Sequence, residues 1–102
     1  MKYMVDIDET ICNSPSNDYT QSTPIPERIA QINSLLDDGH EVHYWTARGG
    51  NSGKDWSDFT IGQLKGWGCR YTSVSFKKPT YDMWIDDRAV NSEVYFGNLG
   101  HR

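Results

Sequence analysis

The stretch Y-M-V-D-I-D-E-T-I-C, residues 3–12, decides the fold expected for this chain. It opens with an apolar run typical of a buried strand, yet Asp6, Asp8 and Glu9 lie within four positions. Successive side chains of a strand point to opposite faces, so Asp6 and Asp8 are expected on one face at the strand's carboxyl end. Carboxylates in that place indicate either a turn that caps the next element or a polar site.

Length and composition favour a single globular domain, residues 1–102. The formal charge of −4 disfavours a nucleic-acid partner without excluding one. Two cysteines without C-x-x-C spacing indicate neither a disulfide framework nor a cysteine zinc site. No leader sequence and no apolar run of about 20 residues is recognisable, so we expect a cytoplasmic protein without a membrane partner.

Hydrophobic periodicity predicts an alternation of strands and helices. Strands are expected over residues 2–8, 41–47, 70–76 and 81–87, and helices over 24–41 and 54–66. Pro26 suits a first helical turn, and Gly39 suits a C-terminal cap. Residues 9–23 are rich in turn formers, which indicates a loop or a small hairpin. From Ala89 onward the pattern indicates at most a short helix.

This alternation predicts an α/β fold, a Rossmann-like parallel sheet with helices on both faces. Right-handed crossovers place the second and third strands successively to one side of the first, so the sheet order is expected to be 3-2-1-4. The order then reverses beside the first strand, between strands 1 and 2 or strands 1 and 4. Ligands of such sheets bind there, beyond the carboxyl ends of the strands. Those ends carry Asp6, Asp8, Thr46, Asp86 and Asp87.

Four carboxylates in one cleft need a cation to remain ionised together. A hard divalent ion such as Mg²⁺ fits, because it takes oxygen ligands and often shares them with a substrate phosphate. A carboxylate can also attack phosphorus and form an aspartyl-phosphate. Lys77 and Lys78 precede the last expected strand, where a lysine could hold a phosphate oxygen beside that nucleophile.

Taken together, these segments resemble the haloacid dehalogenase (HAD) phosphatases. D-I-D-E-T, residues 6–10, resembles motif I, Asp-x-Asp-x-Thr. V-H-Y-W-T-A-R-G, residues 42–49, resembles motif II, an apolar strand ending in Thr or Ser. K-K-P-T-Y-D-M-W-I-D-D-R-A, residues 77–89, resembles motifs III and IV, a Lys followed by an apolar strand ending in Asp-Asp. The motifs occur in the family's order, and the resemblance spans roughly residues 3–92.

The resemblance implies catalytic roles for four residues. Asp6 would be the nucleophile and would ligate Mg²⁺. Asp8 would be the general acid/base and would ligate the ion through its backbone carbonyl. Thr46 would hold the transferring phosphoryl group, and Lys78 fits motif III better than Lys77.

The same resemblance implies further metal and substrate contacts. Asp87 is expected as a direct ligand of the ion with Asp86 assisting, and Arg88 is expected to pair with a carboxylate. Glu9 stands where many relatives have glycine and is assigned no catalytic role. The substrate contacts that the resemblance implies are Thr10, Thr46, Ala47, Arg48 and Lys78.

The chain has no room for the cap domain that closes the site of many HAD phosphatases. About a dozen residues separate Cys12 from the first expected helix, and one helix and one strand fill the interval from Thr46 to Lys78. The resemblance to capless members implies that a large substrate or a second subunit completes the pocket, so a homo-oligomer is one expected assembly. Tyr19, Trp56 and residues 48–56 are the expected contacts.

The function expected from these features is a Mg²⁺-dependent phosphomonoester hydrolase that acts through an aspartyl-phosphate. Similarity to small bacterial and phage proteins sharing Y-W-T-A-R-G suggests a sugar phosphate of surface-polysaccharide synthesis as the substrate. Two alternatives stay open, a nucleotide or polynucleotide 3′-phosphatase and a non-catalytic HAD-like binding module. Core and helix–sheet packing, rather than base stacking, is expected for the four tryptophans, Trp45, Trp56, Trp67 and Trp84.

Overall fold

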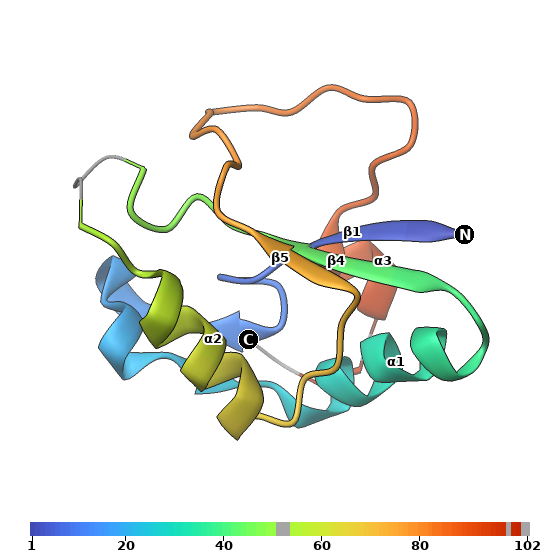
Figure 1. Ribbon diagram of the computed structural model, residues 1–102. Coiled ribbons are helices and arrows are strands. Elements are labelled where there is room, and N and C mark those ends of the chain that lie inside the picture. The colour runs from blue at the N-terminus through green and yellow to red at the C-terminus, as the bar shows by residue number, and fades with distance from the viewer. Residues whose placement is uncertain (51–53, 98, 101–102) are drawn as a thin grey trace.

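A three-stranded parallel sheet forms the centre of the computed structural model, which describes residues 1–50, 54–97 and 99–100. The strands are β1 (Lys2–Asp6), β4 (Glu41–Trp45) and β5 (Ser73–Ser75), in the order β1-β4-β5 (Figure 1). Both strand pairs are parallel, and the register aligns Asp6 with Trp45 and Trp45 with Ser75. The predicted arrangement of the first three strands is therefore confirmed.

A small hairpin follows β1, as the turn-rich composition predicts. Its two strands, β2 (Cys12–Asn13) and β3 (Thr23–Pro24), pair antiparallel. Two short 3₁₀ turns, η1 (Pro15–Asn17) and η2 (Tyr19–Gln21), connect them. The side chain of Asp18 accepts a hydrogen bond of 3.1 Å from the backbone N–H of Thr20, which caps the second turn.

Three helices complete the described chain, namely α1 (Pro26–Asp37), α2 (Ser57–Gly66) and α3 (Ser92–Phe96). Pro26 opens α1, and Gly39 follows its C-terminus with φ of +89°, as the sequence predicts. Asn91 caps α3 by accepting from the backbone N–H of Glu93 at 2.8 Å. None of these helices, within the ranges given above, is long and apolar enough to cross a membrane.

One hydrophobic core lies on a single face of the sheet. Alternation along β4 turns Val42 and Tyr44 inward, where both are fully buried, and leaves His43 on the opposite face. All three helices contribute to this same core, and Figure 1 shows α1 and α2 on one side of the sheet. Its residues are Val5, Ile7, Ile11, Cys12, Ile29, Ile32, Val42, Tyr44, Leu64, Cys69 and Phe96.

The expectation of helices on both faces is therefore wrong. A parallel sheet covered on both sides needs strands that are apolar throughout, whereas E-V-H-Y-W in β4 alternates. On the uncovered face Met4 is 54% exposed, and Asp6 and Trp45 are half-buried. The sheet thus has one core face and one face that no described helix covers.

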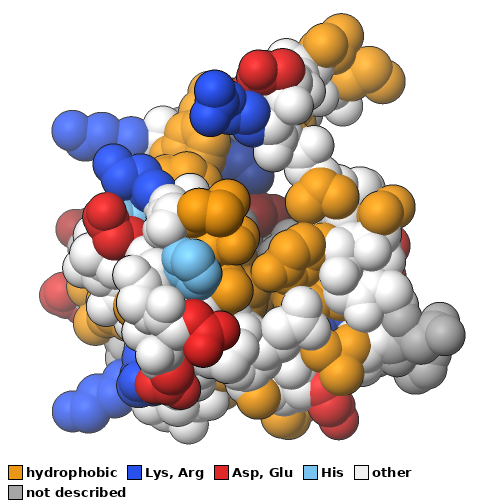
Figure 2. Space-filling view, turned by 90° about the vertical axis from the view of Figure 1, so that its right-hand side faces the viewer, with side chains coloured by type: hydrophobic (Ala, Val, Ile, Leu, Met, Phe, Trp, Pro, Cys, Tyr) orange, Lys and Arg blue, Asp and Glu red, His pale blue; other side chains and the backbone are white. Residues whose placement is uncertain are grey.

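The predicted fourth strand over residues 81–87 is also wrong. Residues 79–91 are all exposed and form an arch above the sheet (Figure 1), and we call this segment the arch. Figure 2 shows hydrophobic side chains on a part of the surface that stands clear of the main body. Met83 and Ile85, at 77% and 90% exposure, have no core to enter. Trp84 instead packs on Trp45 at the end of β4, with ring centroids 5.5 Å apart, so an alternating pattern alone did not decide strand pairing.

Candidate active site

The carboxyl end of β1 carries an ion pair between Asp6 and Lys78. Lys78 Nζ lies 3.2 Å from Asp6 Oδ1, and the hydroxyl of Thr10 donates to Asp6 Oδ2 at 3.3 Å. Lys78 comes three residues after β5, so residues from both edges of the sheet meet here. The structure thus brings together three of the residues that the motifs predicted.

Partial burial changes the acidity of Asp6. Burial raises the pKa of its carboxyl group above the ordinary value, and the Lys78 ammonium opposes this rise by stabilising the carboxylate. The nearby Asp8 charge raises the pKa further. About a third of the Asp6 side chain (36%) remains exposed, so a ligand can reach its oxygens.

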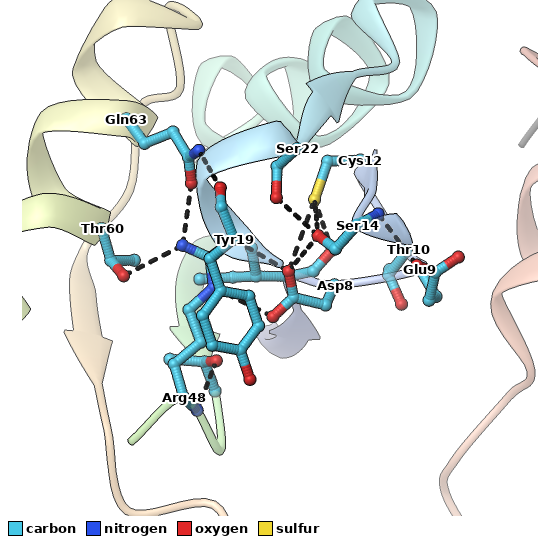
Figure 3. Close-up of polar contacts among 12 residues, drawn as sticks. Asp8, Glu9, Thr10, Cys12, Ser14, Tyr19, Ser22, Arg48, Thr60 and Gln63 are labelled. Atoms are coloured by element: carbon cyan, nitrogen blue, oxygen red, sulfur yellow. Dashed lines mark hydrogen bonds and ion pairs between the residues drawn. The ribbon is translucent and has the colours of Figure 1, made fainter. Parts of the chain in front are cut away.

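Asp8 is held by a two-pronged ion pair with Arg48 (Figure 3). Arg48 Nε donates to Asp8 Oδ2 at 2.9 Å, and Arg48 Nη2 donates to Asp8 Oδ1 at 2.8 Å. The hydroxyl of Ser14 also donates to Asp8 Oδ1, and Ser14 in turn contacts the hydroxyl of Ser22 at 2.6 Å. Asp8 therefore has one fixed orientation, set by the hairpin on one side and by the loop after β4 on the other.

Arg48 is fully buried and joins three parts of the chain. Its Nη1 donates to Thr60 Oγ1 at 3.0 Å and to Gln63 Oε1 at 2.8 Å, both on α2. Its guanidinium lies 4.5 Å from the ring centroid of Tyr19, and Gln63 Nε2 donates to the Tyr19 carbonyl at 2.9 Å. The exposed fraction of the Arg48 side chain is 0%, and the substrate contact expected of Arg48 stays a prediction. In this arrangement its guanidinium orients Asp8.

Thr46 connects the loops that leave β4 and β5. It is buried, its N–H donates to the Ser75 carbonyl at 3.0 Å, and its carbonyl accepts from the Lys78 N–H at 3.3 Å. Its hydroxyl accepts from the Arg48 N–H at 3.1 Å. Ala47 follows half-buried, and its carbonyl accepts from Gly50 at 3.0 Å. Thr46 thus positions both Lys78 and Arg48 through the backbone.

The turn after β1 depends on Glu9 and on a distant arginine. Glu9 has φ of +62°, a left-handed conformation that glycine adopts most easily. Its carboxylate accepts from the Ser14 N–H at 2.9 Å. The fully buried Arg28 donates to the carbonyls of Thr10 and Leu99, each at 3.1 Å. The C-terminal segment thereby helps to hold the turn that carries Thr10.

Asp86 and Asp87 do not join this group. Both lie on the exposed arch, where Asp86 accepts from the Arg88 N–H at 2.7 Å and Asp87 pairs with Arg88 Nε at 3.7 Å. The predicted pairing of Arg88 with a carboxylate is thus confirmed. Across residues 1–50, 54–97 and 99–100, no three His, Cys, Asp or Glu side chains are grouped to hold a metal ion. The four-carboxylate cluster expected from the sequence is therefore not formed among the described residues, where no strand of the arch pairs with β1.

A pocket of about 330 Å³ opens beside the loop after β4. It coincides with part of the segment expected to contact a substrate, residues 48–56, of which residues 51–53 lie outside the described chain. Lys54 Nζ lies 4.3 Å from the Trp56 ring centroid, and Tyr19 packs edge-on against Trp56 at 5.0 Å. The lining of this pocket includes Gly49, Gly50, Lys54, Asp55, Trp56 and Phe76.

Three residues of the Asp8 network are not recognisable from the sequence pattern. Ser14 belongs to a run of turn formers, and Thr60 and Gln63 lie in a helix identified by its apolar residues. The spacing of Thr60 and Gln63, three positions apart on the face that also carries buried Leu64, was the available signal. A polar pair on such a face, with Thr60 buried and Gln63 half-buried, needs a partner, which here is Arg48.

Comparison with known proteins supports the fold. Neither a protein-family model nor a curated protein matches this chain. The crystal structure of a structural-genomics target from Vibrio cholerae is similar, with a TM-score of 0.80 and 26% sequence identity. The similarity covers 94% of this chain and 87% of that one. A small α/β fold with a parallel sheet is therefore shared between the two, and no activity follows from the comparison.

Proposed function

We propose that the protein is a Mg²⁺-dependent phosphomonoester hydrolase of the capless HAD type, with Asp6 as its nucleophile. The observation that carries this proposal is the half-buried Asp6 carboxylate paired with Lys78 at 3.2 Å, at the carboxyl end of a parallel strand. Nucleophile and cation are thus adjacent where such sheets bind ligands. Among the described residues, the hairpin fills the whole interval between Cys12 and α1. This supports the absence of a cap domain at that point.

The donor set near Asp6 fits a magnesium ion. Mg²⁺ prefers oxygen ligands and uses one or two carboxylates together with water and substrate phosphate. Asp6 offers a partly exposed carboxylate whose pKa is raised by burial and by Asp8. A cation there would stabilise the ionised carboxylate and so oppose both effects on its pKa. Because the Asp8 carboxylate is bound by Arg48, its backbone carbonyl is the group left to contact the ion. Magnesium would neutralise negative charge on the transferring phosphoryl group.

The residues of the chain can carry out the two steps of phosphate transfer. Asp6 attacks phosphorus, the bond to the leaving oxygen breaks, and Asp8, which must enter this step as the carboxylic acid, gives that oxygen its proton. In the second step Asp8 takes a proton from water, the water oxygen attacks phosphorus, and the bond to Asp6 breaks. Lys78 stabilises the phosphate oxygens throughout, and Arg48 fixes the orientation of the Asp8 side chain.

Replacing the nucleophile tests this proposal directly. Asp6→Asn keeps the shape of the side chain but removes the attacking oxygen's charge, so we expect phosphate release from p-nitrophenyl phosphate with Mg²⁺ to fall at least about 1000-fold. The control is Asp37→Asn, which removes an exposed carboxylate paired with Arg70 and should leave the rate unchanged. Undiminished turnover by Asp6→Asn would exclude the covalent mechanism.

A further inference from the structure

Three aromatic rings gather beside the candidate active site. Trp45 ends β4, while Tyr81 and Trp84 belong to the arch. The Trp84 ring meets Trp45 edge-on, with centroids 5.5 Å apart and planes at 89°. Tyr81 meets Trp84 at 5.1 Å and 60°. The arch is thus anchored to the sheet by aromatic contacts.

Two of these rings remain open to solvent. Trp84 is 41% exposed and Tyr81 is 48% exposed, although each side chain makes a ring contact. Single exposed aromatic residues are common on protein surfaces. Adjacent rings that meet edge-on do not share one plane, but each ring with free area remaining offers its own face to a planar ligand. The expectation that Trp84 lies in the core is therefore wrong.

This aromatic surface lies next to Lys78. The Lys78 ammonium is 5.4 Å from the Tyr81 ring centroid and 5.8 Å from that of Trp45. Successive contacts of 3.2, 5.4 and 5.1 Å lead from Asp6 Oδ1 through Lys78 and Tyr81 to the Trp84 ring. A phosphate bound at Asp6 and Lys78 is therefore close enough to the rings for its leaving group to reach them.

We infer that Trp45, Tyr81 and Trp84 form an aromatic platform for the base of a nucleotide whose phosphate lies at Asp6 and Lys78. The inference rests on the proposed function, because it names the leaving group of that reaction. Base–aromatic stacking strengthens binding, and it needs no hydrogen-bonding side chains. A nucleotide thus gains affinity from the ring surface that a simple phosphate ester does not.

One carboxylate beside the rings, that of Asp86, is already hydrogen-bonded. Recognition of a sugar requires side chains that are free to bond to its hydroxyl groups. Asp86 is the side chain that contacts the Trp84 indole N–H, at 3.4 Å, and its other oxygen accepts from the Arg88 N–H at 2.7 Å. The platform therefore offers ring surface to a ligand, while its neighbouring carboxylate is already engaged.

Binding of AMP and ribose 5-phosphate tests the inference, because the two ligands share the sugar phosphate and differ by the base. Calorimetry with Asp6→Asn should show AMP binding at least about tenfold more tightly, which corresponds to about 1.4 kcal/mol of stacking. Trp84→Ala in the same background should reduce the preference to less than about threefold. Met83→Ala, which changes a side chain that is 77% exposed on the same arch, should retain it.

Equal affinity for the two ligands, or tighter binding of ribose 5-phosphate, would overturn the platform. An AMP preference that survives Trp84→Ala would overturn it as well. The ratio of kcat/KM for AMP and ribose 5-phosphate in the wild-type enzyme gives the same comparison without the Asp6 substitution. Phosphate release without an AMP preference refutes the platform alone. A Trp84-dependent AMP preference without any phosphate release refutes the hydrolase and supports the platform.

Discussion

Replacing Arg48 with methionine should strongly destabilise the fold. The Arg48 side chain has no exposed surface, and its guanidinium donates four hydrogen bonds, two to Asp8 and one each to Thr60 and Gln63. Removing one partner of a buried pair costs about 3–5 kcal/mol, because the other charge stays buried and unpaired. Asp8 keeps 21% exposure and its bond from Ser14, so we expect the lower value, about 3 kcal/mol.

A loss of this size is measurable and large for a domain of 102 residues. Small domains have about 5–15 kcal/mol of unfolding free energy, and each 1 kcal/mol shifts Tm by about 4–8 °C. Urea unfolding followed by tryptophan fluorescence should therefore show a much lower midpoint for Arg48→Met, and thermal unfolding a Tm lower by about 12–24 °C.

Two further variants separate the buried charge from other effects. Arg70→Met removes an arginine that pairs with Asp37 at the similar distance of 2.9 Å, but with 54% and 64% exposure, so it should cost less than about 1 kcal/mol. Asp8→Asn combined with Arg48→Met removes the unpaired charge and should recover part of the loss. The reasoning fails if Arg48→Met costs no more than Arg70→Met, or if the double variant is no more stable than Arg48→Met.

Two other predictions concern the metal and the cysteines. Millimolar Mg²⁺ should raise the Tm of the wild type but not of Asp6→Asn, because an ion that binds only the folded state stabilises it; equal shifts in a thermal-unfolding assay would place the ion elsewhere. Burial raises the pKa of Cys12 and of Cys69 from 9.0 to about 11, so the unfolded thiols ionise first and stability should fall as pH rises from 9 to 11. Urea midpoints across this range test it, and a Cys12→Ala/Cys69→Ala variant with an undiminished fall would contradict it.

Elements with a local signal were predicted correctly. The apolar alternation of β4, the proline and glycine that bound α1 and the turn formers of the hairpin all act within a few residues. The order β1-β4-β5 also follows from local features, since helical connections between parallel strands are right-handed. Asp6 and Lys78 were predicted to meet because both stand at the carboxyl edge of that sheet.

The errors share a different origin. Residues 81–87 alternate as a strand would, yet Trp84 finds its packing partner in Trp45, and the arch that results keeps Asp86 and Asp87 away from Asp6. Helices were expected on both faces, but β4 alternates, and its Glu41 and His43 lie on a face that no described helix covers. In each case the pattern allowed more than one packing, and contacts between distant segments selected one.

The sequence by itself determined the strand ends that carry Asp6, Asp8, Thr46 and Lys78, because strand periodicity and crossover handedness are properties of the local chain. Only the tertiary structure decided what surrounds them. Arg48 became the buried partner of Asp8 because α2 and the hairpin enclose it with Thr60, Gln63 and Tyr19. Burial and ion pairing depend on distances through space, and residues 40 positions apart in the chain, such as Asp8 and Arg48, acquire theirs only on folding.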